Sequence, residues 1–213
     1  MRQVRTLPRL QIGIVAILRG IGPAHAKDIA LALVEQGIRA IEIPLNSPDP
    51  FRSIEVIRAC TPDDCLIGAG TVLEAGDVAR LASAGGELLV APNFDPGVVE
   101  AARRANMITM PGVFSPSEAI AASRFGVSAL KFFPASVLGT GGVSAIRAIL
   151  PADTAIAAVG GVEAGDFARW SKAGIRLFGI GSGLYRAGDD HRTVASRARS
   201  AVDAWRLACS KLS

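Results

Sequence analysis

Short apolar runs, most of them rich in β-branched residues, recur along the whole chain. They begin 20 to 28 residues apart and are four to seven residues long, which is typical of buried strands and too short for most helices. The runs cover residues 12–18, 38–43, 66–69, 87–90, 107–110, 128–132, 154–158 and 175–180. This pattern predicts eight buried β-strands.

Segments with helical spacing of apolar residues separate these runs, most clearly at 24–36, 115–125 and 163–172. The three segments are followed by glycines at 37, 126 and 174, as helix C-termini commonly are. Strands that alternate with helices form parallel β/α units, and eight such units close a barrel. We therefore predict an α/β fold, a single-domain (β/α)8 TIM barrel that spans residues 1–213.

Two other interpretations of the pattern are less consistent with the sequence. An open doubly wound sheet would offer a GxGxxG turn after a strand, whereas Gly68-Ala-Gly70 is followed by Thr-Val-Leu. The apolar run at 10–18, with arginines before it and Ala-His-Ala at 24–26, imitates a secretory leader. Because Arg19 follows the run directly and the series needs a first strand, we expect residues 12–18 to be that strand.

Composition and charge exclude several classes of protein. Half of the 213 residues are hydrophobic and 20% are charged, so a chain of this size can bury a core and is not expected to be disordered. No uncharged apolar run approaches the roughly 20 residues that cross a bilayer, so no membrane partner is expected. The net charge of +4 comes from the two ends, since residues 1–9 and 186–213 carry +3 each. Only 5% of residues are aromatic, so these basic ends are expected to be solvated faces and not a nucleic-acid site.

The cysteines and histidines do not form a recognisable metal or disulfide pattern. Cys60, Cys65 and Cys209 are odd in number and lack CxxC spacing, which favours free thiols in a reducing cytoplasm. His25 and His191 lie in helix-like segments without a partner at ligand spacing. We expect both histidines at the surface, and neither a metal nor another cofactor.

Three charged residues mark the ends of otherwise apolar strands: Arg19 on the first, Glu42 on the second and Lys131 on the sixth. In a barrel, the C-terminal ends of the strands converge on one mouth, where chemistry is located. Each of the three alternates in phase with small or apolar neighbours, so each can point inward. A buried trio held together only by ion pairing is the structural alternative, but such trios add little stability. We therefore expect a functional site.

Lys131 is the most informative of the three. It is one of only four lysines and has Leu130, Phe132 and Phe133 as neighbours, so its amine is expected to be poorly solvated and able to attack a carbonyl. That is Schiff-base chemistry. Glu42 would then move the protons that carbon–carbon cleavage requires, and the forked guanidinium of Arg19 suits a substrate carboxylate.

Glycine-rich turns follow the last two predicted strands. Val159 is followed by Gly160 and Gly161, and the eighth strand runs into Gly181-Ser182-Gly183. Glycines let backbone N–H groups approach an anion, and the loops after the seventh and eighth strands commonly bind phosphate, with help from a helix N-terminus. The sequence therefore predicts a phosphate site here.

Taken in order, several motifs resemble the pyruvate-dependent class I aldolases that cleave 2-keto-3-deoxy-6-phospho sugar acids. The resemblance runs from about residue 12 to 187. The motifs are AILRG at 16–20, IEIPLNSP at 41–48, GAGT at 68–71, APN at 91–93, PGVFSPSE at 111–118, LKFFPA at 130–135 and AVGG at 158–161. The resemblance implies a homotrimer that acts on a small phosphorylated substrate.

The resemblance also implies a role for each matching residue. Lys131 would form the Schiff base and Glu42 would be the general acid and base, while Arg19, Thr71 and Pro92 would line the pyruvate end. The remaining matches would lie around the imine and the phosphate. They are Phe133, which would pack beside the imine, and Gly160, Gly161, Gly181 and Ser182, which would hold the phosphate.

Two positions depart from the family members that cleave the gluconate epimer, which carry an Arg and a Thr there. Here these positions are Asn46 and Val159, as in the branch that acts on 2-dehydro-3-deoxy-6-phosphogalactonate. The expected products are pyruvate and glyceraldehyde 3-phosphate. Three alternatives stay open: the gluconate epimer as substrate, a sugar-phosphate isomerase or epimerase, which would not need Lys131, and a non-catalytic sugar-phosphate-binding barrel, which would tolerate the loss of Glu42.

Overall fold

The strands form one parallel sheet in the computed structural model, which describes residues 5–8 and 10–209. The sheet order is β5-β4-β3-β2-β1-β9-β8-β7-β6. The strands are β1 Ile14–Ile17, β2 Ala40–Pro44, β3 Leu66–Gly70, β4 Leu88–Val90, β5 Ile108–Met110, β6 Gly112–Val113, β7 Leu130–Phe132, β8 Ile156–Val159 and β9 Leu177–Ile180. All eight predicted strands are present, with boundaries that differ by up to two residues.

The ninth segment, β6, lies beyond the fifth predicted strand at 107–110, and Pro111 separates it from β5. Proline has no N–H to donate to a sheet, and it separates β5 from β6 by one residue. The two segments occupy opposite ends of the sheet order, so the chain itself joins those ends. Hydrogen bonds from Ala129 N–H to the Thr109 carbonyl (3.1 Å) and from Lys131 N–H to the Pro111 carbonyl (3.0 Å) close the cylinder. The predicted (β/α)8 barrel is thus confirmed.

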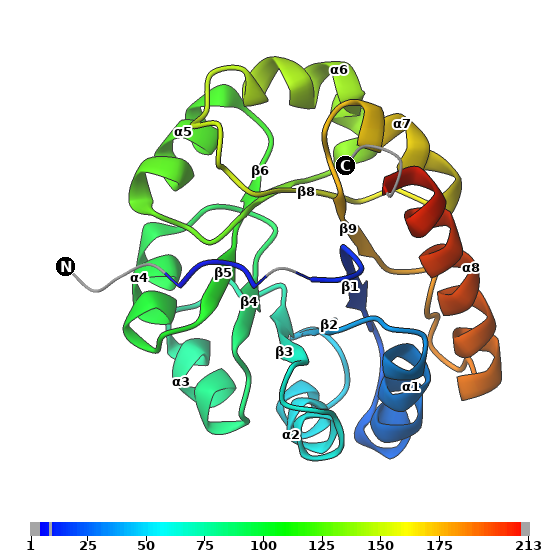
Figure 1. The fold of residues 1–213 in the computed structure, drawn as a ribbon. Helices are drawn as coiled ribbons and strands as arrows, with labels where there is room; N and C mark the ends of the chain where they lie inside the picture. Colours follow the sequence, from blue (N-terminus) through cyan, green and yellow to red (C-terminus); the bar gives the residue numbers. More distant parts are fainter. Residues whose placement is uncertain (1–4, 9, 210–213) are drawn as a thin grey trace.

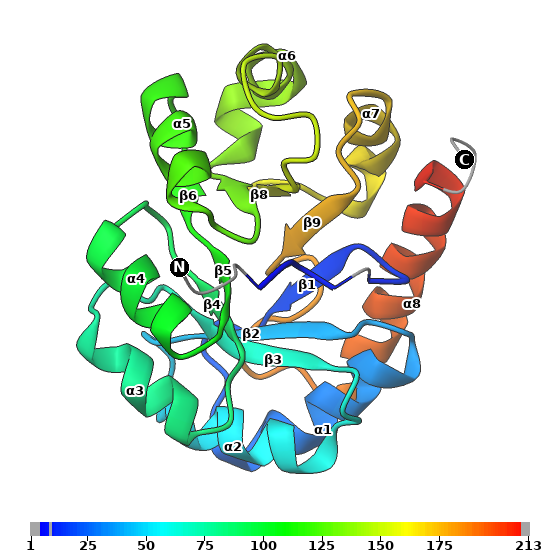
Figure 2. The same cartoon turned by 60° about the vertical axis from the view of Figure 1, so that its left-hand side comes forward.

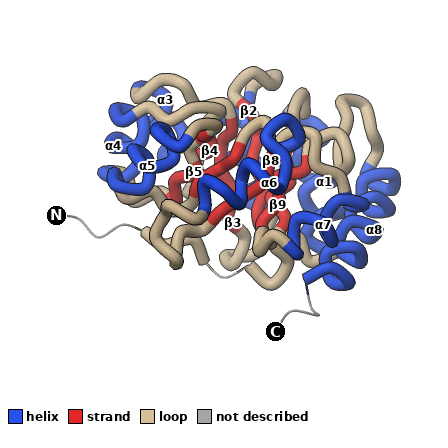
Figure 3. The backbone as a smooth tube through the Cα atoms, turned by 90° about the horizontal axis from the view of Figure 1, so that it is seen from above, coloured by secondary structure: helices blue, strands red, loops and turns tan. Residues whose placement is uncertain are grey.

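Helices surround the barrel, as Figures 1 and 2 show from two directions and Figure 3 shows from above. They are α1 Pro23–Glu35, α2 Pro50–Cys60, α3 Gly76–Ser83, α4 Pro96–Arg104, α5 Pro116–Phe125, α6 Ala135–Arg147, the 3₁₀ turn η1 Ala164–Asp166, α7 Phe167–Lys172 and α8 His191–Cys209. No helix in the described part of the chain is long and apolar enough to cross a membrane.

Local sequence signals explain where several helices begin and end. Proline occupies the first turn of α1, α2, α4 and α5, where its missing N–H costs nothing. Ser115 and Glu118 form a reciprocal capping box at the start of α5, and Gly126 ends that helix with a φ of 76°. The predicted helices at 24–36 and 115–125 are confirmed. The one at 163–172 is divided into η1 and a short α7.

The alternation of side chains along the strands creates two apolar layers. One cluster fills the space between the sheet and the helices. The other fills the interior of the barrel and includes Val15, Ala40, Ala129 and Val159. Because side chains two apart on a strand share a face, the residues that follow Ala40 and Ala129 in phase, Glu42 and Lys131, also face inward. This alternation supports the inward orientation that the sequence predicts for these two residues.

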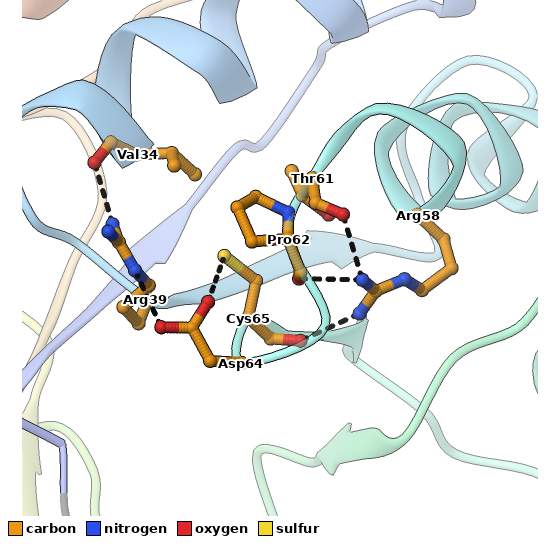
Figure 4. Close-up of polar contacts among 7 residues, drawn as sticks. All are labelled: Val34, Arg39, Arg58, Thr61, Pro62, Asp64 and Cys65. Carbon is orange, nitrogen blue, oxygen red and sulfur yellow. Dashed lines mark hydrogen bonds and ion pairs between the residues drawn. The ribbon is translucent and has the colours of Figure 1, made fainter.

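The N-terminal ends of the strands are closed by arginines. The Arg5 side chain pairs with Glu87 and donates to the Asn106 carbonyl at 3.1 Å, so the chain crosses this end of the barrel before β1 begins. Figure 4 shows the neighbouring network, in which Arg58 donates to the carbonyls of Thr61, Pro62 and Cys65, and Arg39 pairs with Asp64. Arg5 therefore holds the N-terminal segment against the barrel and is not part of a solvated helix face. Arg2 and Arg9 lie outside the described residues.

Candidate active site

A cavity of about 460 Å³ opens at the C-terminal ends of the barrel strands. Every residue to which the sequence assigned a catalytic or substrate-binding role lies in its lining. These residues are Arg19, Glu42, Thr71, Pro92, Lys131, Phe133, Val159, Gly160, Gly161, Gly181 and Ser182. They come from seven of the nine strands or from the loops directly after them, so the fold brings together residues that lie up to 163 positions apart.

Glu42 and Lys131 face each other across the floor of this cavity. Glu42 lies in the middle of β2 and Lys131 in the middle of β7, on opposite sides of the barrel. Their exposed fractions are only 2% and 6%. Burying two ionisable groups is costly unless they serve a purpose, so their depth in an open cavity favours a chemical role.

The Glu42 carboxyl fits a space that only glycine leaves open. A Cβ on Gly70 of the adjacent β3 would lie 1.9 Å from Glu42 Oε2 and 2.4 Å from Oε1, distances at which no side chain can coexist. Oε2 has no hydrogen-bond partner among the described residues, so it is available to a substrate. Burial raises the pKa of Glu42 from 4.5 to about 7, although Lys131 and Arg19 oppose this shift. A carboxyl with this pKa can both accept and donate a proton near neutrality.

The pKa of the Lys131 amine is shifted in the opposite direction, below its ordinary value. Burial lowers its pKa, the carboxylate of Glu42 raises it and the positive charge of Arg19 lowers it further. Its Nζ lies 4.8 Å from the centre of the Phe133 ring. By comparison, Lys27 and Lys172 are exposed on helices, whereas Lys211 lies outside the described residues. Lowering the pKa increases the fraction of free amine, which is the nucleophilic form.

Arg19 differs from the expectation in its location. It lies in a turn two residues after the end of β1 and is exposed, so Glu42 and Lys131 are a buried pair and not part of a buried trio. Its guanidinium donates to Asn46 Oδ1 at 2.5 Å and to Thr71 Oγ1 at 3.4 Å. Thr71 has a φ of 55°, which is strained for a β-branched residue and typical of functional sites. Asn46 therefore acts on the cavity through Arg19.

The glycine turns that follow β8 and β9 also line the cavity. Gly160 has a φ of 90°, and a Cβ there would lie 2.9 Å from the Phe133 ring, so only glycine permits this turn beside Phe133. The helix expected after Gly161 is shorter than predicted, because only the three-residue η1 and the six-residue α7 follow. An anion bound here would therefore be held by backbone N–H groups of the turns and by Ser182, because no long helix begins at this point.

Among the lining residues to which the sequence assigned no role, three have polar or charged side chains: Glu163, Tyr185 and Arg186. Arg186 was assigned to the solvated basic C-terminal segment, but it precedes α8 and lies in the loop that follows β9. Its position four residues after Ser182 was the signal that could have identified it. His25 and His191 are exposed on α1 and α8, as predicted.

A second cavity, of about 430 Å³, lies at the N-terminal ends of the strands. Two arginines in its lining, Arg5 and Arg39, are paired with Glu87 and Asp64. Burial raises the pKa of its Cys65 thiol, which makes the thiol less nucleophilic. Among the described residues that line this cavity, none is an activated nucleophile, whereas the cavity at the opposite end holds the buried pair Glu42 and Lys131.

A buried amine opposite a buried carboxyl in the mouth of a β/α barrel is an arrangement suited to imine chemistry. The family model for KDPG and KHG aldolase matches residues 8–196, so the chain belongs to this aldolase family. It is 54% identical over 199 residues to a probable 2-dehydro-3-deoxy-6-phosphogalactonate aldolase of Rhizobium meliloti, covering 93% of this chain and 94% of that protein.

Two further comparisons agree. The 2-dehydro-3-deoxy-6-phosphogalactonate aldolase of Escherichia coli K12 is 42% identical over 198 residues, covering 93% of this chain and 97% of that protein. A solved structure described as native KDPGal superimposes with a TM-score of 0.90 at 41% identity, covering 99% of this chain and all of that one. Family membership removes the isomerase and the non-catalytic binding protein from the alternatives.

Proposed function

We propose that this chain cleaves 2-dehydro-3-deoxy-6-phosphogalactonate to pyruvate and glyceraldehyde 3-phosphate, with Lys131 as the imine-forming residue and Glu42 as the general acid and base. The observation that carries the proposal is the buried Lys131 amine opposite the buried Glu42 carboxyl on the floor of one cavity. The substrate is the one named for the relatives at 54% and 42% identity.

The first half of the reaction builds an electron sink on Lys131. The free amine attacks the C2 carbonyl carbon of the substrate, and loss of water from the resulting carbinolamine leaves a protonated imine. Glu42, with a pKa of about 7, donates the proton that converts the departing hydroxyl to water. The carboxylate that remains is the base for the next step.

The second half breaks the carbon–carbon bond and returns all groups to their starting state. Glu42 takes the proton from the C4 hydroxyl, the C3–C4 bond breaks, and its electron pair moves into the imine to give an enamine. Glyceraldehyde 3-phosphate leaves with its new carbonyl at the former C4. Glu42 then gives its proton to C3 of the enamine. Water hydrolyses the protonated imine to pyruvate and the free amine, and the proton released in this step returns to Glu42.

Binding groups flank this pair on both sides. Arg19, held by Asn46 and Thr71, would bind the substrate carboxylate, and Pro92 and Phe133 would pack against the pyruvate carbons. Gly160, Gly161, Gly181 and Ser182 would hold the phosphate. Val159, which is buried and also lines the cavity, offers no hydrogen-bond donor to the C4 hydroxyl and supports the choice of the galactonate epimer.

The assay that tests this function presents both C4 epimers to the purified protein and measures pyruvate release with lactate dehydrogenase. The proposal expects cleavage of both, with the higher kcat/KM for the galactonate epimer. A preference for the gluconate epimer would contradict the substrate assignment, and the absence of pyruvate from both would contradict the activity.

The proposal extends to the assembly and the location of the protein. The family resemblance implies a homotrimer, which light scattering would detect as a mass of about 66 kDa, three times the chain mass of 22.0 kDa. A mass of about 22 kDa would contradict it. All three cysteines are free thiols, which supports the cytoplasmic location expected from the sequence.

A further inference from the structure

Arg186 has a charged side chain in the active-site cavity that the catalytic scheme does not use. It lies in the loop between β9 and α8 and lines the cavity together with Gly181 and Ser182. Its Nε donates to the Ser182 carbonyl at 3.3 Å. This contact places the guanidinium beside the loop that the proposed function assigns to the substrate phosphate.

The backbone of this loop is anchored to α8. The Arg186 N–H donates to Asp189 Oδ2 at 2.7 Å, and the Asp189 N–H donates back to the Arg186 carbonyl at 3.0 Å. Asp189 in turn forms an ion pair with Arg197 of α8, and its pKa is lowered mainly by the Arg186 N–H and also by Arg197. The loop is thus fixed at Arg186 through backbone atoms, and of the guanidinium only Nε is used, in the hydrogen bond to the Ser182 carbonyl.

The guanidinium is not neutralised within the protein. In the part of the chain that the structure describes, no carboxylate lies within ion-pair distance of Arg186. Asp189 forms its ion pair with Arg197, although the charge of Arg186 also contributes to the lowered pKa of Asp189. Arg186 therefore brings to the cavity lining a positive charge that no ion pair among the described residues holds.

The charges of the cavity require such a group at the phosphate end. Arg19 donates to Asn46 and Thr71 and is assigned to the substrate carboxylate, and Lys131 is committed to the imine. The glycine turns and Ser182 are uncharged, whereas Glu163 adds a negative charge to the same lining. A phosphate dianion bound beside a carboxylate without a nearby cation would be repelled.

We propose that Arg186 binds the phosphate of the substrate directly and so selects phosphorylated over unphosphorylated sugar acids. The inference rests on the proposed function, since it takes the phosphate to bind at the glycine turns. The forked guanidinium offers two parallel N–H groups to phosphate oxygens, a geometry that a lysine ammonium does not reproduce. Asp189 and Arg197 are the residues that position it.

The test compares two aldehydes in the reverse reaction with pyruvate: glyceraldehyde 3-phosphate and glyceraldehyde. Arg186→Gln should lower the ratio of their kcat/KM values about tenfold or more, because only the first carries the phosphate. Arg186→Lys should give a ratio between those of Arg186→Gln and the wild type. Arg192→Gln, which removes an exposed arginine of α8 outside the cavity lining, is the matched control and should leave the ratio unchanged.

A binding measurement separates this inference from the proposed function. Titration of the protein with inorganic phosphate in a calorimeter requires no turnover, and Arg186→Gln should bind at least about tenfold more weakly than the wild type and Arg192→Gln. Equal phosphate binding and an equal aldehyde ratio in all three proteins would overturn the role of Arg186. Loss of phosphate binding in Arg186→Gln, together with a wild type that forms no imine with pyruvate, would instead overturn the proposed function alone.

Discussion

The exchange of pyruvate methyl protons with deuterium isolates the proton transfer assigned to Glu42. Pyruvate forms the imine with Lys131, and the Glu42 carboxylate then removes a methyl proton and returns a deuteron. With a pKa of about 7, Glu42 is about 9% ionised at pH 6 and about 91% ionised at pH 8. At low pyruvate concentration, where the rate reports the free enzyme, exchange should therefore rise about tenfold between these pH values.

The size of this rise depends on the burial of Glu42. At its ordinary pKa of 4.5 the same carboxyl would already be about 97% ionised at pH 6, and exchange would rise by only about 3%. Glu42→Gln keeps the shape but cannot accept a proton, so exchange should fall by roughly 10²-fold or more. Exchange is followed by loss of the methyl signal in proton NMR.

A matched control is the other carboxylate in the cavity lining, Glu163. Glu163→Gln should keep the tenfold rise between pH 6 and pH 8. If the wild type shows no rise, or if Glu42→Gln exchanges at the wild-type rate while Glu163→Gln does not, then Glu42 is not the base and the reasoning from its burial is refuted.

The same pKa shift predicts how stability varies with pH. Because the folded pKa of Glu42 is raised, the folded state binds more protons than the unfolded state between pH 4.5 and about 7. The contribution of Glu42 is therefore fully present below pH 4.5 and is lost as the pH rises through about 7, a change of about 3 kcal/mol. Glu42→Gln lacks this loss, so its unfolding free energy relative to the wild type should increase from pH 4.5 to pH 8. Urea titrations would contradict the prediction if this difference were constant.

Further predictions concern the residues around this pair. Gly70→Ala places a Cβ within 2 Å of the Glu42 carboxylate and should lower turnover by at least tenfold, as for a displaced catalytic group, with unchanged kinetics as the contradicting result. Asn46→Leu removes the acceptor that holds Arg19 and should raise the KM for pyruvate by a factor of about 2 to 12, the worth of one hydrogen bond, whereas Asn46→Asp should keep a near-normal KM. Val159→Thr should shift the epimer ratio toward the gluconate substrate by a similar factor, and an unchanged ratio would show that C4 is read elsewhere.

Much of the fold could be predicted because the interior of a barrel requires a regular pattern. The eight apolar runs correspond to strands with errors of up to two residues, and the phase that paired Ala40 with Glu42 correctly predicted the inward face. The short segment β6 beyond Pro111 was not predicted, although this proline is visible in the sequence. A proline ends a strand or only interrupts it according to the neighbouring strands with which its flanking residues pair. That pairing is set by the tertiary structure and cannot be read from the local sequence.

The site could be predicted where chemistry and strand position coincide. Glu42 and Lys131 are charged residues within apolar strands, so their burial follows from the pattern. Arg186 could not be recognised in this way, because it lies outside the strands. Its position four residues after Ser182 becomes informative only when the path of the loop after β9 is known. The partnership of Arg19 with Asn46 likewise depends on the path of two loops, which the sequence does not specify.

The central claim is that Lys131 forms an imine with pyruvate, and reductive trapping tests it most directly. Borohydride reduces the imine to a stable secondary amine, whereas pyruvate that it reduces in solution leaves no group on the protein. Incubation with pyruvate and borohydride should therefore inactivate the enzyme and leave a stable pyruvyl-derived group on the peptide that contains Lys131. Lys131→Met should remain unlabelled. Lys27 and Lys172, which are exposed on helices outside the cavity lining, should also remain unlabelled. Labelling of either residue in place of Lys131, or the absence of any label in an active enzyme, would contradict the account.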